Sequence, residues 1–298
     1  PRPRPRRQRV GRALSSRVVG AFDMGSNDRR DGGPGDVSAA SHEHVTDVRD
    51  RIAAQPAFAA SRATAESLLE AGWPSLERLS EVAGIRCVAD VSAPRRRGRL
   101  RERASLYDAS ITERGVLPTR AANWHDLFNV VIWAAFPRTK RALHARQYRR
   151  LCERVPAHFQ RLPGARTPEQ SALTQLDEGG LLLCVPDHAP IGAEERLLTT
   201  LAHLATARIP LTTTHLAPHE ARPLIFGHAL LEHLALEAPA PRAAVVLLRC
   251  PPLAVDLTLA QRLDDDRQPF TCAPVSAWIT SALSTRETAA TVERGTQV

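Results

Sequence analysis

Lysine, asparagine, methionine and aromatic residues are scarce in this sequence. Its 298 residues include one lysine, one methionine and three asparagines, and aromatic residues make up 4%. Because nearly all basic residues are arginine, and alanine and proline are abundant, the composition is typical of a GC-rich genome. Against this background the rare residues mark one region, since Asn123, Asn129 and Lys140 all lie within residues 123–140, together with four aromatic residues.

Long hydrophobic runs and paired cysteines are also absent. No apolar stretch reaches the ~18–20 residues that a membrane helix needs, and no secretory hydrophobic segment stands near residue 1. The five cysteines are widely spaced and form no C-x-x-C, which argues against a disulfide framework or a zinc knuckle. We therefore expect a soluble, cytoplasmic protein that does not contact membranes.

The familiar signatures of nucleotide binding and hydrolysis are missing. The chain has no G-x-x-x-x-G-K-[ST], no G-x-G-x-x-G, no G-x-S-x-G and no H-E-x-x-H. The sequence therefore predicts no particular cofactor, reaction or partner, and any function has to be argued from its own residues.

The net charge of +8 is unevenly distributed. Residues 1–24 hold seven arginines and one aspartate, so this segment carries +6 and the rest of the chain is nearly neutral. Nucleic-acid binding is therefore not expected outside the arginine-rich tail. The only methionine is Met24, and one interpretation is that translation begins there and residues 1–23 are upstream sequence. The other is a basic arm that contacts phosphates.

Four segments differ in composition. Residues 1–50 are rich in Arg, Pro, Gly, Ser and Asp without a sustained period, so we expect a disordered tail. Residues 51–104 predict a helical segment and an arginine-rich loop, residues 105–280 a compact domain, and residues 281–298 a frayed terminus. The expected organisation is a single compact domain with a disordered N-terminal tail.

Two helices that meet at a tight corner are predicted over residues 124–135 and 137–153. Asn123 is a good N-cap for the first helix, and Pro137 both ends it and suits the first turn of the second. Most arginines of the second helix are expected to face water: Arg138, Arg141, Arg146, Arg149 and Arg150.

After this corner we expect strands at 173–176 and 181–185 around a hairpin turn, Asp-Glu-Gly-Gly, at 177–180. Further helices are predicted at 194–208, 226–237 and 257–263, and an apolar strand at 243–249. This mixture predicts an α+β fold dominated by helices.

The residues that could carry chemistry lie on two of these helices. His125, Asp126 and Asn129 can share one stripe of the first, where a histidine beside a carboxylate and an amide could act as a general base or bind a metal. His228 and Glu232 stand four apart on another helix and could complete a metal site. Equally, Asp126 could only cap its helix and His228–Glu232 could be an ordinary helical pair.

The longest motif resembles a known family. The letters P-T-R, N-W-H-D-L-F-N, W and F-P-R-T-K follow one another within residues 118–140, and L-D-E-G-G at 176–180 and F-G-H-A-L-L-E at 226–232 come later. This pattern resembles that of the bacterial DUF3025 family over about residues 105–280. The resemblance implies a bacterial protein in which the two polar motifs meet, and it implies no particular reaction.

Two hypotheses follow for the function. In the first, a hydrolase uses a site built from His125, Asp126, Asn129 and His228, with His125, Asp126 and His228 as candidate metal ligands. The residues expected to assist in binding are Arg120, Asn123, Lys140 and Glu232, of which the two basic ones would neutralise an anionic substrate. In the second hypothesis the same residues form a structural hydrogen-bond network in a non-catalytic binding protein. A distance of more than ~10 Å between His125 and His228 would remove most support from the first hypothesis, and metal analysis discriminates between the two.

Overall fold

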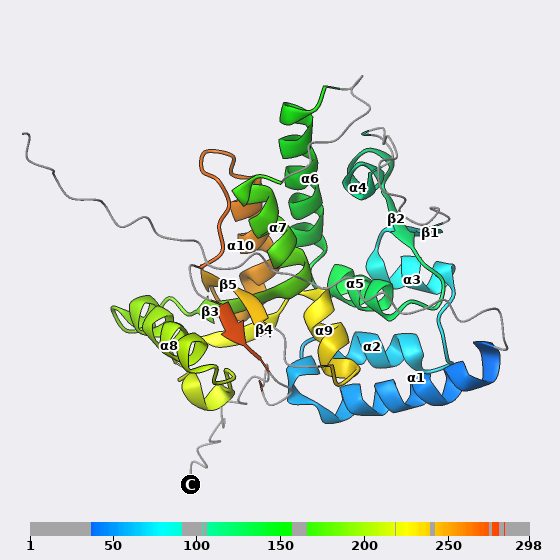
Figure 1. The fold of residues 1–298 in the computed structure, drawn as a ribbon, viewed down its shortest axis with the longest axis horizontal. Helices are drawn as coiled ribbons and strands as arrows, with labels where there is room; N and C mark the ends of the chain where they lie inside the picture. The colour runs from blue at the N-terminus through cyan, green and yellow to red at the C-terminus, as the bar shows by residue number, and fades with distance from the viewer. Residues whose placement is uncertain are drawn as a thin grey trace, which may run out of the picture. The chain divides into compact units, whose positions relative to one another are not determined.

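The computed structural model describes residues 37–90, 103, 106–156, 166–217, 219–238, 242–273, 276–279 and 283. Helices dominate it and two sheets accompany them, so the fold is α+β as expected (Figure 1). Residues from Ser38 onward cluster into one compact unit. The expected arginine-rich loop and frayed C-terminus lie mostly outside the described residues.

The bounds of the elements are as follows. The helices are α1 (Val37–Ala54), α2 (Arg62–Leu69), α3 (Leu76–Ala83), α4 (Tyr107–Arg114), α5 (Trp124–Ala135), α6 (Pro137–Arg154), α7 (Pro168–Gly179), α8 (Ala193–Ala207), α9 (His228–Ala235) and α10 (Val255–Asp264). The strands are β1 (Arg86–Ala89), β2 (Val116–Thr119), β3 (Gly180–Val185), β4 (Arg222–Ile225), β5 (Arg242–Arg249) and β6 (Ser276–Trp278).

The expected disordered tail is shorter than residues 1–50. Residues 1–36 lie outside the described residues, but α1 begins at Val37 and continues through residue 50. Val45, Val48 and Ile52 are all buried, and their spacing places them on one helical face. This face packs into the core. The neighbouring residues in the sequence are mostly small or polar, so the helical pattern of these three apolar residues is not evident from the sequence.

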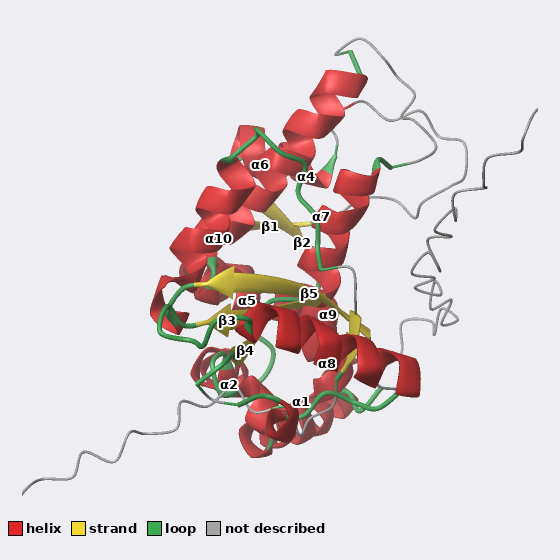
Figure 2. Cartoon of the chain, turned by 90° about the vertical axis from the view of Figure 1, so that its left-hand side faces the viewer, coloured by secondary structure: helices red, strands yellow, loops and turns green. Residues whose placement is uncertain are grey.

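The larger sheet has the strand order β4-β3-β5-β6 (Figure 2). The two central strands, β3 and β5, are parallel, and each edge strand is antiparallel to its neighbour. Every residue of β3 is buried, which explains its unbroken run of apolar residues. The smaller sheet consists of β1 and β2 in parallel.

The corner between α5 and α6 has the predicted form. The Asn123 side chain accepts a hydrogen bond from the Asp126 backbone N–H at 3.1 Å, which caps α5. Pro137 begins α6 directly after α5 ends. α5 packs against α3 and α9, whereas α6 runs beside α10 and α4 (Figure 1).

The prediction of a strand and hairpin turn over residues 173–180 was wrong. Residues 173–179 belong to α7, which runs directly into β3 at Gly180. Thr167 and Gln170 form a capping box at its start, with Pro168 in the first turn. Leu173 and Leu176 are buried three residues apart on one helical face, so the Gly-Gly pair marks a helix end and not a hairpin.

Arg146 was wrongly expected to face water. It is fully buried on α6 and donates from Nε to Glu169 at 2.7 Å. Its Nη1 donates to the carbonyls of Leu263 and Asp265, both at 2.9 Å, and its Nη2 to that of Gln268 at 2.7 Å. Arg146 therefore ties α6 to α7 and to the segment after α10.

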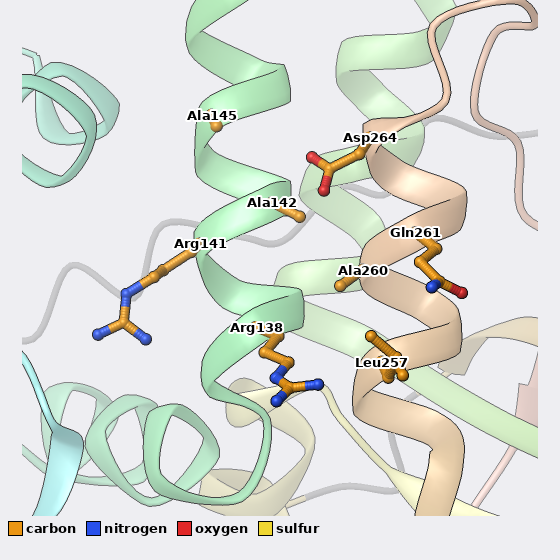
Figure 3. A pocket seen from close by; sticks show the side chains of 8 residues that line it. All are labelled: Arg138, Arg141, Ala142, Ala145, Leu257, Ala260, Gln261 and Asp264. Carbon is orange, nitrogen blue, oxygen red and sulfur yellow. The ribbon is translucent and has the colours of Figure 1, made fainter.

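A groove of about 430 Å³ lies between α6 and α10 (Figure 3). It is lined by Arg138, Arg141, Ala142, Ala145, Leu257, Ala260, Gln261 and Asp264. None of the candidate site residues belongs to it. In the part of the chain that the structure describes, no helix combines the length and apolar character needed to cross a membrane.

Candidate functional site

The candidate site is built where α7 ends and α9 begins. Gly227, just before α9, donates its N–H to the carbonyl of Gly180 at 2.9 Å. A Cβ atom on Gly227 would stand 2.5 Å from the Gly180 nitrogen and 2.6 Å from the Glu178 carbonyl oxygen. Because only glycine permits this close approach, the two backbones touch and bring Glu178 next to His228.

The packing of α5 against α9 adds His125 to this junction. The Nε2 atoms of His125 and His228 lie 2.9 Å apart, and their rings meet edge to face with centroids at 4.4 Å. The two polar motifs of the sequence therefore meet in space. The distance of 2.9 Å is short enough for both Nε2 atoms to bind one metal ion, as the first hypothesis requires.

A third ligand atom completes a triangle. Oε2 of Glu178 lies 3.6 Å from Nε2 of His125 and 3.3 Å from Nε2 of His228. This oxygen is buried and has no hydrogen-bond partner among the described residues. Ligand atoms around a tetrahedral zinc ion with bonds of about 2.0–2.1 Å are separated by roughly 3.3–3.4 Å. The two sides that involve Glu178 lie near this separation, and the 2.9 Å side between the two Nε2 atoms is shorter than it.

Glu232 orients His125 for this role. Its Oε2 lies 2.9 Å from Nδ1 of His125, so Nδ1–H donates to the carboxylate and the lone pair is left on Nε2. A carboxylate behind the second nitrogen is the usual support of a histidine that binds a metal. On the other side of the site, Oδ1 of Asp177 lies 3.9 Å from Nδ1 of His228.

The three groups have perturbed pKa values. Burial lowers the pKa of His125, but the hydrogen bond to Glu232 and the charge of Glu178 outweigh it, and the net shift is upward. Burial and the charge of Asp177 raise the pKa of Glu178. Burial holds the pKa of His228 well below its usual value, which keeps this imidazole in the neutral form that binds metals.

Asp126, although adjacent to His125 in the sequence, does not join the cluster. Its carboxylate accepts from the Arg120 backbone N–H at 2.6 Å, from Nε at 3.0 Å and from Nη2 at 2.7 Å. Successive helical side chains point about 100° apart, so the two neighbours serve different sites. Asn123 is occupied as the cap of α5.

The remaining candidates also have structural partners. Lys140 is fully buried and donates to Asp177, while Asn129 donates from Nδ2 to the Tyr107 hydroxyl at 2.7 Å. Of the residues singled out in the sequence, the structure thus brings together His125, His228 and Glu232. It places Asp126, Asn129 and Lys140 in contacts of their own.

Sequence reasoning assigned Glu178 to a turn and missed it as a candidate ligand. The signal that could have found it is the capping pattern Thr167-Pro168-x-Gln170, which begins a helix. Eleven residues after Thr167, that helix presents Glu178 in its last turn.

Comparison with known proteins agrees with the resemblance in the sequence. A family model described as "Protein of unknown function (DUF3025)" matches residues 93–293. No curated protein and no solved structure matches the chain. Since the matched region covers about two thirds of the sequence and contains all three atoms of the triangle, the chain belongs to the DUF3025 family.

Proposed function

We propose that His125, Glu178 and His228 bind one zinc ion and that the protein is a metal-dependent hydrolase. The observation that carries this proposal is the triangle formed by the two Nε2 atoms and Oε2, with sides of 2.9, 3.3 and 3.6 Å. Two histidines and one glutamate form a ligand set found at catalytic zinc sites, where the fourth position is left for water.

Partial exposure of the site is compatible with a catalytic role. The side chains of His125, Glu178 and Glu232 are 25–29% exposed, whereas Oε2 of Glu178 and nearly all of His228 are buried. Zinc lowers the pKa of its bound water to about 7. A metal held by these residues would supply a hydroxide at neutral pH by releasing one proton of the bound water to solvent. The hydroxide oxygen would form a bond to a carbonyl carbon or phosphorus, the bond from that atom to the leaving group would break, and the leaving group would take up a proton from solvent.

A non-catalytic role is the second candidate, and one observation favours it for part of the motif. Lys140, Asn129 and Asp126 each have a polar side-chain partner within the protein. In this reading His125 and His228 share a proton and belong to the same structural network. The two candidates differ in whether the protein binds zinc with these three side chains.

Zinc analysis of the purified full chain tests the proposal. After incubation with zinc and extensive dialysis, we expect about one ion per wild-type chain and none in Glu178→Gln or His125→Ala. His203→Ala removes an exposed histidine of α8 and serves as the matched control, which should retain the ion. Wild-type protein without zinc, or equal zinc in Glu178→Gln, contradicts the metal site.

A second measurement addresses the reaction. Wild type and Glu178→Gln are compared on a panel of p-nitrophenyl carboxylic and phosphate esters, before and after zinc is removed by a chelator. Hydrolysis that disappears with the chelator, returns with zinc and is absent from Glu178→Gln supports the hydrolase. A zinc-bound protein that hydrolyses no member of the panel favours the non-catalytic candidate.

We also propose that this protein is bacterial and works in the cytoplasm. Its five cysteines are free, and Cys184 of β3 and Cys250, just after β5, are buried without a disulfide. Free buried thiols are typical of a reducing compartment.

A further inference from the structure

A buried ion pair lies directly behind the proposed zinc ligands. Lys140, the only lysine of the chain, is fully buried on α6 and donates from Nζ to Oδ1 of Asp177. Asp177 precedes Glu178 in the last turn of α7. A buried pair of this kind is no more stabilising, on average, than apolar residues of similar size, so its position calls for another explanation.

The position of Asp177 relative to His228 provides that explanation. Oδ1 of Asp177, which accepts from Lys140, also lies 3.9 Å from Nδ1 of His228. His228 is only 3% exposed, and its Nδ1 has no hydrogen-bond partner among the described residues. The carboxylate therefore stands on the side of the imidazole opposite to the proposed metal.

We propose that Asp177 and Lys140 are positioning residues for the zinc ligand His228, an inference that rests on the proposed function. A histidine that binds through Nε2 needs an acceptor for its Nδ1–H. His125 has Glu232 for this purpose at 2.9 Å, and the carboxylate that faces Nδ1 of His228 is that of Asp177, whose Oδ1 at 3.9 Å lies beyond hydrogen-bond distance and would approach Nδ1 when the metal binds. Lys140 acts through Asp177, because it holds the carboxylate that faces the imidazole.

The double variant Lys140→Met/Asp177→Asn tests this role without leaving an unpaired charge in the interior. Removing both partners of a buried pair is often neutral for stability, whereas removing one is strongly destabilising. We expect the double variant to fold and to bind zinc with a Kd about 10- to 100-fold weaker than wild type, the usual effect of losing a supporting partner. The Kd is measured by competition with a chromophoric zinc chelator.

A matched control uses the pair formed by the buried His144 of α6 and the partly exposed Asp108 of α4. Nδ1 of His144 lies 2.9 Å from Oδ1 of Asp108, one helical turn beyond Lys140. Neither residue has a hydrogen bond to His125, Glu178 or His228 among the described contacts. Asp108→Asn should change stability and leave the zinc Kd at its wild-type value.

The outcomes separate the inference from the function on which it rests. A double variant with wild-type zinc affinity overturns the positioning role and leaves the zinc site intact. Wild-type protein that binds no zinc overturns both. If this double variant does not fold, Lys140→Gln/Asp177→Asn, which also removes both charges and keeps polar groups at both positions, carries the measurement, and a wild-type Kd there overturns the positioning role equally.

Discussion

Helix α7 carries a glutamate near each end, and the two ends are built differently. Near its start, Glu169 meets Arg146, and each of the three guanidinium nitrogens of this buried arginine has an acceptor. Near its end, Glu178 meets His125 and His228, and three atoms that can all accept hydrogen bonds lie within 3.6 Å of one another.

The difference separates a structural cluster from a candidate binding site. Buried polar groups in folded proteins are nearly always paired, and the Arg146 cluster follows that rule. At the other end of α7, a single proton can serve only one contact of the triangle, whereas a divalent cation satisfies all three ligand atoms at once. Hydrogen-bond saturation thus distinguishes the two clusters at the ends of α7.

The largest expected effect concerns the saturated cluster. Arg146→Met removes one donor from Glu169, which keeps Arg150 and the Phe270 N–H, and leaves several backbone carbonyls without the donor that Arg146 supplies. We expect the free energy of unfolding to fall by about 3–5 kcal/mol, as is usual when one partner of a buried pair is lost. Urea denaturation at neutral pH measures this change, and zinc content should stay at the wild-type level. Loss of zinc from folded Arg146→Met would show that the two clusters are not independent.

The next effect concerns the triangle. Zinc at 100 times its Kd should raise the free energy of unfolding of the wild type by about 2.7 kcal/mol, because it binds only the folded state. Glu178→Gln should show none of this stabilisation, since the amide replaces a charged ligand. Thermal unfolding with and without zinc measures both proteins, and the His203→Ala variant should respond as the wild type does. Equal stabilisation of Glu178→Gln would mean that zinc binds elsewhere.

The sequence was sufficient to predict the elements whose ends carry strong local signals. Asn123 and Pro137 delimit α5 as expected. The apolar run at residues 181–185 predicts a strand, and β3 lies there. The α+β class followed from such elements. The candidate site was predicted in part, because His125, His228 and Glu232 lie on helices that were recognised.

The parts of the fold and of the candidate site that were not predicted from the sequence depend on contacts between distant segments. Asp-Glu-Gly-Gly has the composition of a turn, but a Cβ on Gly180 would stand 2.4 Å from the Leu176 carbonyl oxygen, and the backbone of the distant Gly227 lies against the same residues. Arg146 has the same sequence context as its exposed neighbours, and its burial depends on carbonyls more than 110 residues away. Local patterns contain no information about such partners.

A smaller effect is expected at the support of His125. Glu232→Gln keeps an oxygen near Nδ1 but removes the charge that makes this histidine a better ligand. Zinc affinity should fall by about 10- to 100-fold, which corresponds to roughly 1.4–2.7 kcal/mol. The measurement is the same chelator competition, and the fall should be smaller than for Glu178→Gln. If the two variants lose zinc equally, Glu232 is itself a ligand.

The smallest effect is expected at Asp126, the immediate neighbour of His125. Its partner Arg120 is half exposed, so the loss of their ion pair in Asp126→Asn should lower the free energy of unfolding by about 1 kcal/mol or less. The cap of α5 involves the Asp126 backbone and stays in place. Zinc affinity should not change, because the carboxylate faces Arg120 and not the triangle. A loss of zinc from Asp126→Asn would return Asp126 to the ligand set and break the distinction between satisfied and unsatisfied carboxylates.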